Sequence, residues 1–290
     1  MNSVVTVGDW LTEAEKVLAQ ARVPSAHLDA GLLLATALSV EEGKTVDRSR
    51  VYAMASANLS SDTLELADSL LERRKAREPM AYITEKKEFY GREFAVTNAV
   101  LIPRPETETI IEIVKLLPIK APRIADVGTG SGVIGITLAL ELPESKVTLG
   151  DISRSAYEVA SYNMRVLGVG GKLVQSNLLK DFFGTYDLVV ANLPYIDRTW
   201  EVSPEVAYEP ERALYAGDEG LFYIKKLLQE AKSKLAKNGL IIVEADERQH
   251  EKLIAFAQRN DYNHRLTKGL ILVFSLAKDF RKNSIPVAKR

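Results

Sequence analysis

The chain has 290 residues and carries 38 lysines and arginines against 39 aspartates and glutamates, for a formal net charge of −1. This balance argues against a protein that holds nucleic acid on a broad basic face. The absence of cysteine excludes disulfides, thiolate metal sites and a cysteine nucleophile. Apolar residues make up 46% of the chain, and its length predicts a main domain accompanied by a smaller one.

The sequence also disfavours metal sites and membrane spans. His27, His250 and His264 are scattered without the spacing of metal ligands, so we predict no metal site. The sequence begins without a secretory signal, and no apolar run reaches the ~20 residues that a membrane span needs. We therefore expect a cytoplasmic protein that does not bind a membrane.

The first part of the chain, residues 1–82, has the apolar periodicity of helices throughout and predicts a small helical bundle. Thr6 and Asp9 are spaced for a capping box at the first helix, and Ser25 is placed to cap the second. The last helix of this region ends with four cations, which suit the helix dipole and favour a solvated helix end over a partner-binding patch. These cations are Arg73, Arg74, Lys75 and Arg77.

The next segment, residues 83–100, predicts a β-hairpin linker. After it, Pro105 suits the first position of a helix, and Glu106 and Glu108 suit the first turn, where the dipole favours anions. Plain helix initiation explains Pro105. It does not explain Arg104, which stands between two prolines.

From residue 101 to 278, strand and helix patterns alternate, which implies right-handed crossovers and a mostly parallel sheet in a doubly wound α/β fold. The final two strands have no helix between them and should pair antiparallel. The predicted strands are 123–127, 146–150, 172–176, 186–191, 240–244, 262–266 and 271–276. The predicted helices are 132–142, 153–167, 221–235 and 247–260. The remaining residues, 279–290, form a basic tail that we predict to be frayed.

Local signals also predict several helix ends. Ser155 with Glu158, and Asp246 with Gln249, have the spacing of capping boxes at the second and fourth of these helices. Asn238-Gly239 is expected to end the third helix, because both residues adopt the left-handed conformation readily.

Residues 124–132 predict a strand that runs into a glycine-rich turn and then a helix. Residues 130–135 match G-x-G-x-x-G, in which glycines let a ligand approach the backbone and the helix start offers free N–H groups. Asp151 ends the next strand, at the spacing of an acid that binds ribose hydroxyls. Taken alone, this pattern fits a dinucleotide-binding oxidoreductase equally well.

Two features favour a different ligand. Asp126 ends the first strand just before the glycines, where a carboxylate repels a pyrophosphate but suits a cationic amino group. Residues 192–195, Asn-Leu-Pro-Tyr, follow the fourth strand, which lies beside the first in a doubly wound sheet. A ligand that joins a ribose to an amino acid and faces an amide-binding pocket is S-adenosylmethionine.

The turn at residues 192–195 suits a planar NH2 group. Asn192 offers a carboxamide, Pro194 leaves neighbouring backbone carbonyls free to accept, and Tyr195 supplies a flat wall. Taken alone, this sequence is equally well explained as a polar turn after a strand that has no catalytic role. Combined with the glycine turn and Asp151, it favours methyl transfer to a planar nitrogen.

These residues resemble the release factor glutamine methyltransferases, the PrmC/HemK family of Rossmann-like S-adenosylmethionine-dependent methyltransferases. The resemblance covers nearly the whole chain and rests on segments 78–83, 101–108, 126–132, 192–197, 209–214 and 217–221. The sequence departs from the family at Leu193, where a second proline is usual, at Asn177, where aspartate is usual, and at Glu85, where glycine is common. Asn-Leu-Pro-Tyr also resembles the turn of rRNA adenine dimethyltransferases.

The resemblance implies a seven-stranded methyltransferase sheet, mostly parallel with its last strand antiparallel, in residues 101–278. It also implies a factor-docking helical domain in 1–82 and a hairpin linker in 83–100. The implied activity is N5-methylation of the glutamine in the Gly-Gly-Gln loop of a peptide chain release factor. We expect a monomer that binds this protein substrate and no nucleic acid stably.

The resemblance further assigns roles to individual residues. The implied catalytic residues are Asn192, Pro194 and Tyr195. The implied cofactor-binding residues are Asp126, Gly128, Thr129, Gly130, Ser131, Gly132, Asp151, Ile152, Asn177, Leu178 and Asn192. The implied substrate-binding residues are Asn192, Leu193, Pro194, Tyr195, Arg104 and Glu106.

Four other hypotheses remain open from the sequence. An adenine-N6 methyltransferase of DNA or RNA presents a similar planar NH2 group, and a ribosomal protein offers another glutamine. A dinucleotide oxidoreductase leaves the turn at residues 192–195 unexplained. A cofactor-binding scaffold without turnover is the fourth.

Overall fold

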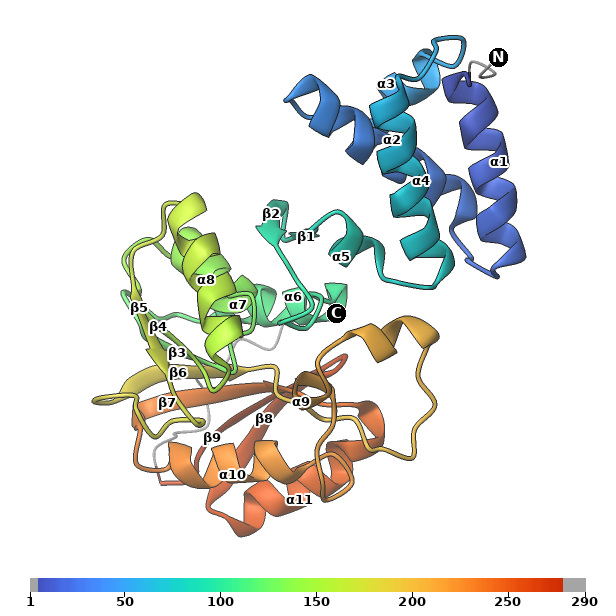
Figure 1. The fold of residues 1–290 in the computed structure, drawn as a ribbon. Helices are drawn as coiled ribbons and strands as arrows, with labels where there is room; N and C mark the ends of the chain where they lie inside the picture. The colour runs from blue at the N-terminus through green and yellow to red at the C-terminus, as the bar shows by residue number, and fades with distance from the viewer. Residues whose placement is uncertain (1–4, 279–290) are drawn as a thin grey trace. The chain divides into compact units, whose positions relative to one another are not determined.

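The computed structural model describes residues 5–278, so the basic tail predicted at 279–290 lies outside the described residues. The chain divides into two compact units, and each is described by itself (Figure 1). The first unit holds residues 1–85 and 203–208, and the second holds 86–202 and 209–290. Nothing in the sequence pattern indicated that residues 203–208 belong with the first unit. The domain boundaries at 82 and 100 stay a prediction.

The first unit is a bundle of helices around one apolar core. Its helices are α1 (Val7–Gln20), α2 (Ala26–Glu42), α3 (Arg48–Ala53), α4 (Ser61–Lys75) and α5 (Met80–Ile83), with the 3-10 turn η2 at Pro204–Tyr208. The capping box of Thr6 and Asp9 forms as predicted. Ser25 occupies the predicted N-cap position of α2, but its hydroxyl donates to the Asp29 side chain at 2.9 Å and makes no capping bond with the backbone.

The end of α4 is not the solvated cluster that we expected. Arg74 is buried, and its Nε donates to Asp29 at 2.8 Å. Glu205 lies 3.5 Å from Arg74 and 2.6 Å from Arg77, so it joins two of the cations. The Tyr208 hydroxyl also donates to the Ala76 carbonyl at 2.5 Å. These contacts hold the distant 203–208 segment in the first unit.

The second unit begins with a hairpin and a short helix. Strands β1 (Lys86–Phe89) and β2 (Arg92–Ala95) pair antiparallel, as predicted. The 3-10 turn η1 (Pro105–Thr107) starts at Pro105, as predicted, and leads into α6 (Glu108–Lys115).

The second unit is built around a seven-stranded sheet with the strand order β5-β4-β3-β6-β7-β9-β8. The strands are β3 (Arg123–Val127), β4 (Lys146–Asp151), β5 (Lys172–Gln175), β6 (Tyr186–Ala191), β7 (Leu235–Glu244), β8 (Tyr262–Lys268) and β9 (Ile271–Leu276). Strands β3 to β7 pair in parallel, whereas β9 runs antiparallel to both β7 and β8. The predicted fold class is confirmed, including the antiparallel pairing of the last two strands.

Helices cover both faces of this sheet (Figure 1). Besides α6, the helices of this unit are α7 (Val133–Glu141), α8 (Arg154–Val166), α9 (Glu211–Leu214), α10 (Phe222–Ala231) and α11 (His250–Arg259), with the 3-10 turn η3 at Glu247–Gln249. Successive side chains of a strand point to opposite faces, so Ile242 packs with α6 and α7 while Ile241 packs with α10 and α11. Each fully buried side chain of this size contributes about 1.5–3 kcal/mol.

Three local predictions have mixed outcomes. Asp246 and Gln249 form the predicted capping box, at η3. The box at Ser155 was wrong, because α8 is capped by Ser153, whose hydroxyl accepts from the Ala156 N–H. The predicted end of the third helix was also wrong. Helix α10 stops at Ala231, and Asn238 lies inside β7 with φ 64°, where the pairing with β6 shifts register.

The buried pair of Arg74 and Asp29 gives a stability prediction for the first unit. In Asp29→Ala, Arg74 loses its closest carboxylate and keeps the Glu78 carbonyl at 3.0 Å and the more distant Glu205 at 3.5 Å, so the free energy of unfolding should fall by roughly 3 kcal/mol. Denaturant titration measures this change in the free energy of unfolding. Unfolding is followed by the fluorescence of Trp10 in a Trp200→Phe background, which leaves Trp10 as the one tryptophan. The exposed Glu13→Ala serves as the control, with a change within about 0.5 kcal/mol. Equal effects of the two substitutions would contradict the prediction.

Candidate active site

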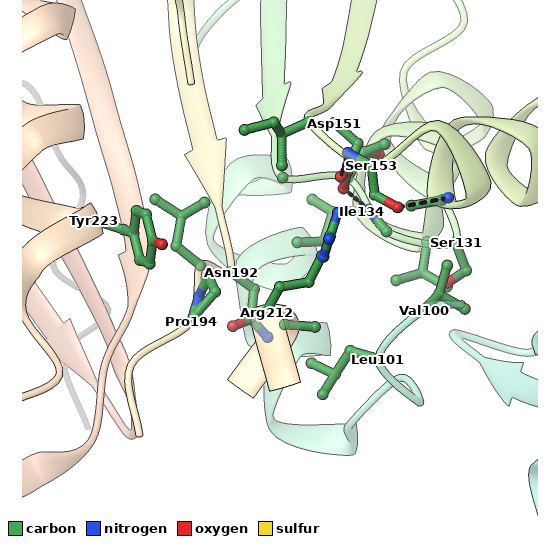
Figure 2. Close-up of a pocket in the computed structure, with 18 of the residues that line it drawn as sticks. Val100, Leu101, Ser131, Ile134, Asp151, Ser153, Asn192, Pro194, Arg212 and Tyr223 are labelled. Carbon is green, nitrogen blue, oxygen red and sulfur yellow. Dashed lines mark hydrogen bonds between the residues drawn. The ribbon is translucent and has the colours of Figure 1, made fainter. Parts of the chain in front are cut away.

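A cavity of about 380 Å³ lies at the carboxyl ends of β3, β4 and β6. The chain builds β4 and β5 on one side of β3 and then crosses to β6 on the other. Such a reversal of strand order opens a crevice at the carboxyl edge of an α/β sheet. Figure 2 shows side chains from several segments around this cavity, including Val100, Ser131, Asp151 and Asn192.

The glycine turn after β3 forms one wall. Gly128 and Gly130 both have positive φ, 72° and 56°. A Cβ on Gly128 would lie 2.7 Å from Leu193 Cδ2, whereas a Cβ on Gly130 would meet nothing within 4 Å. Gly128 is therefore required for packing, and Gly130 leaves the backbone open to the cavity. Gly128, Thr129, Gly130 and Ser131 line the cavity, but Gly132 caps α7 behind them.

Asp126 lies behind the glycine turn and does not line the cavity. Its Oδ2 accepts from the Gly135 N–H at 2.9 Å and from the Thr129 hydroxyl. Its Oδ1 is buried and has no hydrogen-bond partner in the described part of the chain. Complete burial raises the pKa of Asp126 to about 6. This carboxylate holds the turn in shape and keeps one acceptor atom unused.

Asp151 is fixed at the cavity wall by two backbone N–H groups. Its Oδ2 accepts from Gly130 at 3.0 Å and its Oδ1 from Ser153 at 2.8 Å. Burial raises the pKa of Asp151, and the backbone hydrogen bonds from Ser153 and Gly130, followed by the positive charge of Arg212, partly offset that rise. A carboxylate oxygen accepts more than one hydrogen bond, so both oxygens remain able to bind hydroxyls.

The wall beside Asp151 also contains the other residues that we predicted near it. Ile152, Asn177 and Leu178 line the cavity, and the Ile152 side chain is exposed. Leu178 has φ 51°, so the chain turns sharply just after β5. This part of the cavity presents apolar surface next to an acid.

The turn after β6 forms the opposite wall, through Asn192, Leu193 and Pro194. Asn192 Nδ2 donates to Thr107 Oγ1 at 3.1 Å. With the amide nitrogen engaged there, the carboxamide oxygen remains to accept from a group in the cavity. Tyr195, predicted to wall the pocket, does not line the cavity. Its hydroxyl donates to Glu244 Oε1 at 3.1 Å, and burial together with Glu244 raises the pKa of Tyr195.

The segment before α6 closes a third side. Arg104 lines the cavity and forms an ion pair with Glu209. Glu209 is the first residue after the 203–208 segment. The second oxygen of Glu209 accepts from the Ile102 N–H at 3.0 Å. Glu209 therefore ties two distant segments together beside the cavity. Glu106 is exposed and does not line it.

Several cavity residues escaped the sequence reasoning. Thr107 lies inside the 101–108 segment that we singled out, and Arg212 inside 209–214, so both were within reach of the motifs. Leu101, at the start of the same 101–108 segment, also lines the cavity. Val100 and Tyr223 line it as well, and no local pattern marks these two. Figure 2 shows Arg212 and Tyr223 on the wall formed by the chain that follows β6.

The described residues contain neither a candidate metal site nor a candidate membrane-spanning helix. Within residues 5–278, no group of three His, Asp or Glu side chains is placed to hold a metal ion. No helix in that range combines the length and apolarity needed to cross a membrane.

Comparisons with known proteins show which proteins this chain resembles. Residues 9–84 match the family model of the PrmC N-terminal domain, and residues 107–209 match that of the Methyltransferase small domain. The chain is 34% identical to a release factor glutamine methyltransferase of Deinococcus radiodurans, over 85% of this chain and 88% of that protein. It is 37% identical to one of Koribacter versatilis, over 83% and 86%.

A solved structure supports the fold. A methyltransferase from Pyrococcus furiosus is similar with a TM-score of 0.52 at 19% identity, over 71% of this chain and 96% of that one.

The buried Asp126 gives a pH prediction. Its pKa is about 6 in the folded chain, above the ordinary 3.8, so ionisation costs stability as the pH rises from about 4 to about 6. Asp126→Asn removes that cost. The free energy of unfolding of the variant, relative to the parent, should therefore increase by about 2–3 kcal/mol between pH 4 and pH 7.

Denaturant titrations at several pH values measure this difference. The exposed Glu158→Gln is the control and should show no such pH-dependent gain. A difference between parent and Asp126→Asn that stays constant across this pH range would rule the prediction out.

Proposed function

This chain belongs to the family of release factor glutamine methyltransferases, and from that premise we propose its reaction. It transfers a methyl group from S-adenosylmethionine to the side-chain nitrogen of the glutamine in the Gly-Gly-Gln loop of a peptide chain release factor. The observation that carries this proposal is the single cavity shared by the glycine turn, Asp151 and the Asn192 carboxamide.

The cavity residues fit S-adenosylmethionine, which supplies a methyl group carried on a positively charged sulfonium. Asp151 has lone pairs free for ribose hydroxyls, and the exposed Ile152 offers apolar surface for a flat base. Gly130 leaves room for a close approach to the backbone. The buried Asp126 lies behind the glycine turn and outside the cavity lining, so its negative charge favours a cationic amino group in the cavity without a direct contact.

We assign the remaining cofactor contacts by position. Gly128, Thr129 and Ser131 surround the methionine part, and Asn177 and Leu178 border the adenine. Arg104 lies at the cavity with its charge already paired to Glu209, so it orders the loop at the methionine end. Gly132, behind the turn, supports its shape.

The substrate amide is held by the turn after β6. An amide nitrogen is a poor nucleophile, because its lone pair is delocalised into the carbonyl. Asn192 Oδ1 and the Pro194 carbonyl accept its two hydrogens and thereby fix the direction of the nitrogen. Positioning of this kind is worth effective molarities of ~10⁵–10⁸ M in well-oriented reactions.

No strong base is required from the chain. Once the nitrogen carries the methyl group, its proton becomes acidic and passes to water. Leu193 contacts the glycine turn and keeps the two walls of the cavity together. Tyr195 supports the turn from behind through Glu244.

A labelling experiment tests the reaction. Purified release factor, ribosomal protein and DNA are each offered with radiolabelled S-adenosylmethionine, and the labelled residue is mapped. We expect label on the glutamine of the Gly-Gly-Gln loop. Label on adenine would overturn the proposal in favour of an adenine-N6 methyltransferase. Label on a ribosomal protein alone would overturn it in favour of a ribosomal-protein glutamine methyltransferase.

Asn192→Ala tests the role of the carboxamide. Turnover should fall by at least ~10²-fold, the usual effect of removing one preorganised hydrogen-bonding group. The dissociation constant for S-adenosylmethionine, measured by titration calorimetry, should change by less than about threefold. Asn177→Ala is the matched control, and it should instead raise the dissociation constant for S-adenosylmethionine. Full turnover in Asn192→Ala would refute the assignment.

A further inference from the structure

Glu244, at the end of β7, is a buried acid that the reaction above does not use directly. Only 1% of its surface is exposed. It forms no ion pair with a lysine or arginine in the described part of the chain, and the Thr107 and Tyr195 hydroxyls, together with the Asn192 side chain, donate to it instead. A buried carboxylate is costly unless it is hydrogen-bonded, so its place beside the substrate turn calls for a role.

Its hydrogen bonds form a chain with a defined direction. The Thr107 hydroxyl donates to Glu244 Oε2 at 2.7 Å, and the Tyr195 hydroxyl donates to Oε1 at 3.1 Å. Asn192 Nδ2 then donates to Thr107 Oγ1 at 3.1 Å. All these partners belong to one unit of the chain.

The direction follows from the chemistry of the groups. A carboxylate only accepts hydrogen bonds, and a threonine hydroxyl has a single hydrogen to donate. Because that hydrogen goes to Glu244, Thr107 presents only lone pairs to Asn192. The NH2 side of the Asn192 carboxamide must therefore face Thr107, and its oxygen must face the cavity.

We propose that Glu244 and Thr107 are positioning residues that hold the Asn192 carboxamide in the orientation that accepts a hydrogen from the substrate amide. The inference rests on the proposed function and deepens it. In the flipped orientation, the Asn192 NH2 group would face the NH2 group of the substrate, donor against donor. The substrate nitrogen would then lose one of the two acceptors that fix its direction.

The same orientation determines which side chain is accepted. A glutamine nitrogen brings two hydrogens to the acceptors of the turn. The carboxylate of a glutamate brings none and would place oxygen against oxygen. Glu244 thus contributes to the choice of glutamine over glutamate without touching the substrate.

Paired substitutions at Thr107 test the proposal. Thr107→Val keeps the shape of the side chain and removes the hydroxyl, whereas Thr107→Ser keeps the hydroxyl. We expect kcat for release factor methylation to fall about 10- to 100-fold in Thr107→Val, the scale of one buried polar group left without its partner. Thr107→Ser should stay within about threefold of the parent.

Glu244→Gln tests the other end of the chain with almost no change in volume. Its NH2 group is able to donate to Thr107, which frees the hydroxyl to donate toward Asn192 and lets the carboxamide flip. We expect the same loss of kcat, with the dissociation constant for S-adenosylmethionine within about threefold of the parent. Should Thr107→Val fail to fold, Glu244→Gln compared with Thr107→Ser carries the same test.

A double-mutant comparison separates positioning from a merely structural role. In an Asn192→Ala background, Thr107→Val should cause little further loss, because it acts through Asn192. A loss of the same size in both backgrounds would overturn the proposal, as would unchanged kcat in both Thr107→Val and Glu244→Gln. A parent enzyme that labels no glutamine would instead refute the proposed function, and this inference with it.

Discussion

The parallel pairing of β3 with β6 is the contact on which the site depends. It places Asp126 opposite Val190, so the turns that follow the two strands emerge side by side. Their packing is close enough that a side chain on Gly128 would collide with Leu193. A cofactor wall and a substrate wall, far apart in the sequence, thereby become two sides of one cavity.

Buried acids then hold the segments around that cavity. Asp151 accepts the Gly130 N–H of the glycine turn, and Asp126 accepts the Thr129 hydroxyl of that turn and the Gly135 N–H of α7. Glu209 accepts the Ile102 N–H, and Glu244 accepts two hydroxyls. Each carboxylate gains hydrogen bonds that offset part of the cost of its burial, although Asp126 Oδ1 has no partner in the described residues. Negative charge beside the glycine turn also suits a cationic ligand better than a pyrophosphate, which agrees with the family membership of the chain.

Local sequence signals succeeded where neighbouring residues alone decide the structure. The capping box at Thr6, the helix start at Pro105 and the alternation of strands with helices all follow from contacts within a few residues. They failed where distant packing decides. Asn238-Gly239 is a plausible helix end, but the pairing of β7 with β6 draws these residues into the strand. Arg74 looks solvated until Asp29 and Glu205 enclose it.

The sequence by itself determined the alternation of strands with helices, the glycine turn and the identity of Asn192, because strand periodicity and turn chemistry are local. Only the tertiary structure decided which way the Asn192 carboxamide points. That orientation depends on Thr107 and Glu244, which are separated from Asn192 by long stretches of chain and meet it only in the folded sheet. The same holds for Tyr195, whose hydroxyl is bound by Glu244 and turned from the cavity. Hydrogen-bond direction depends on neighbours in space, and no local pattern records it.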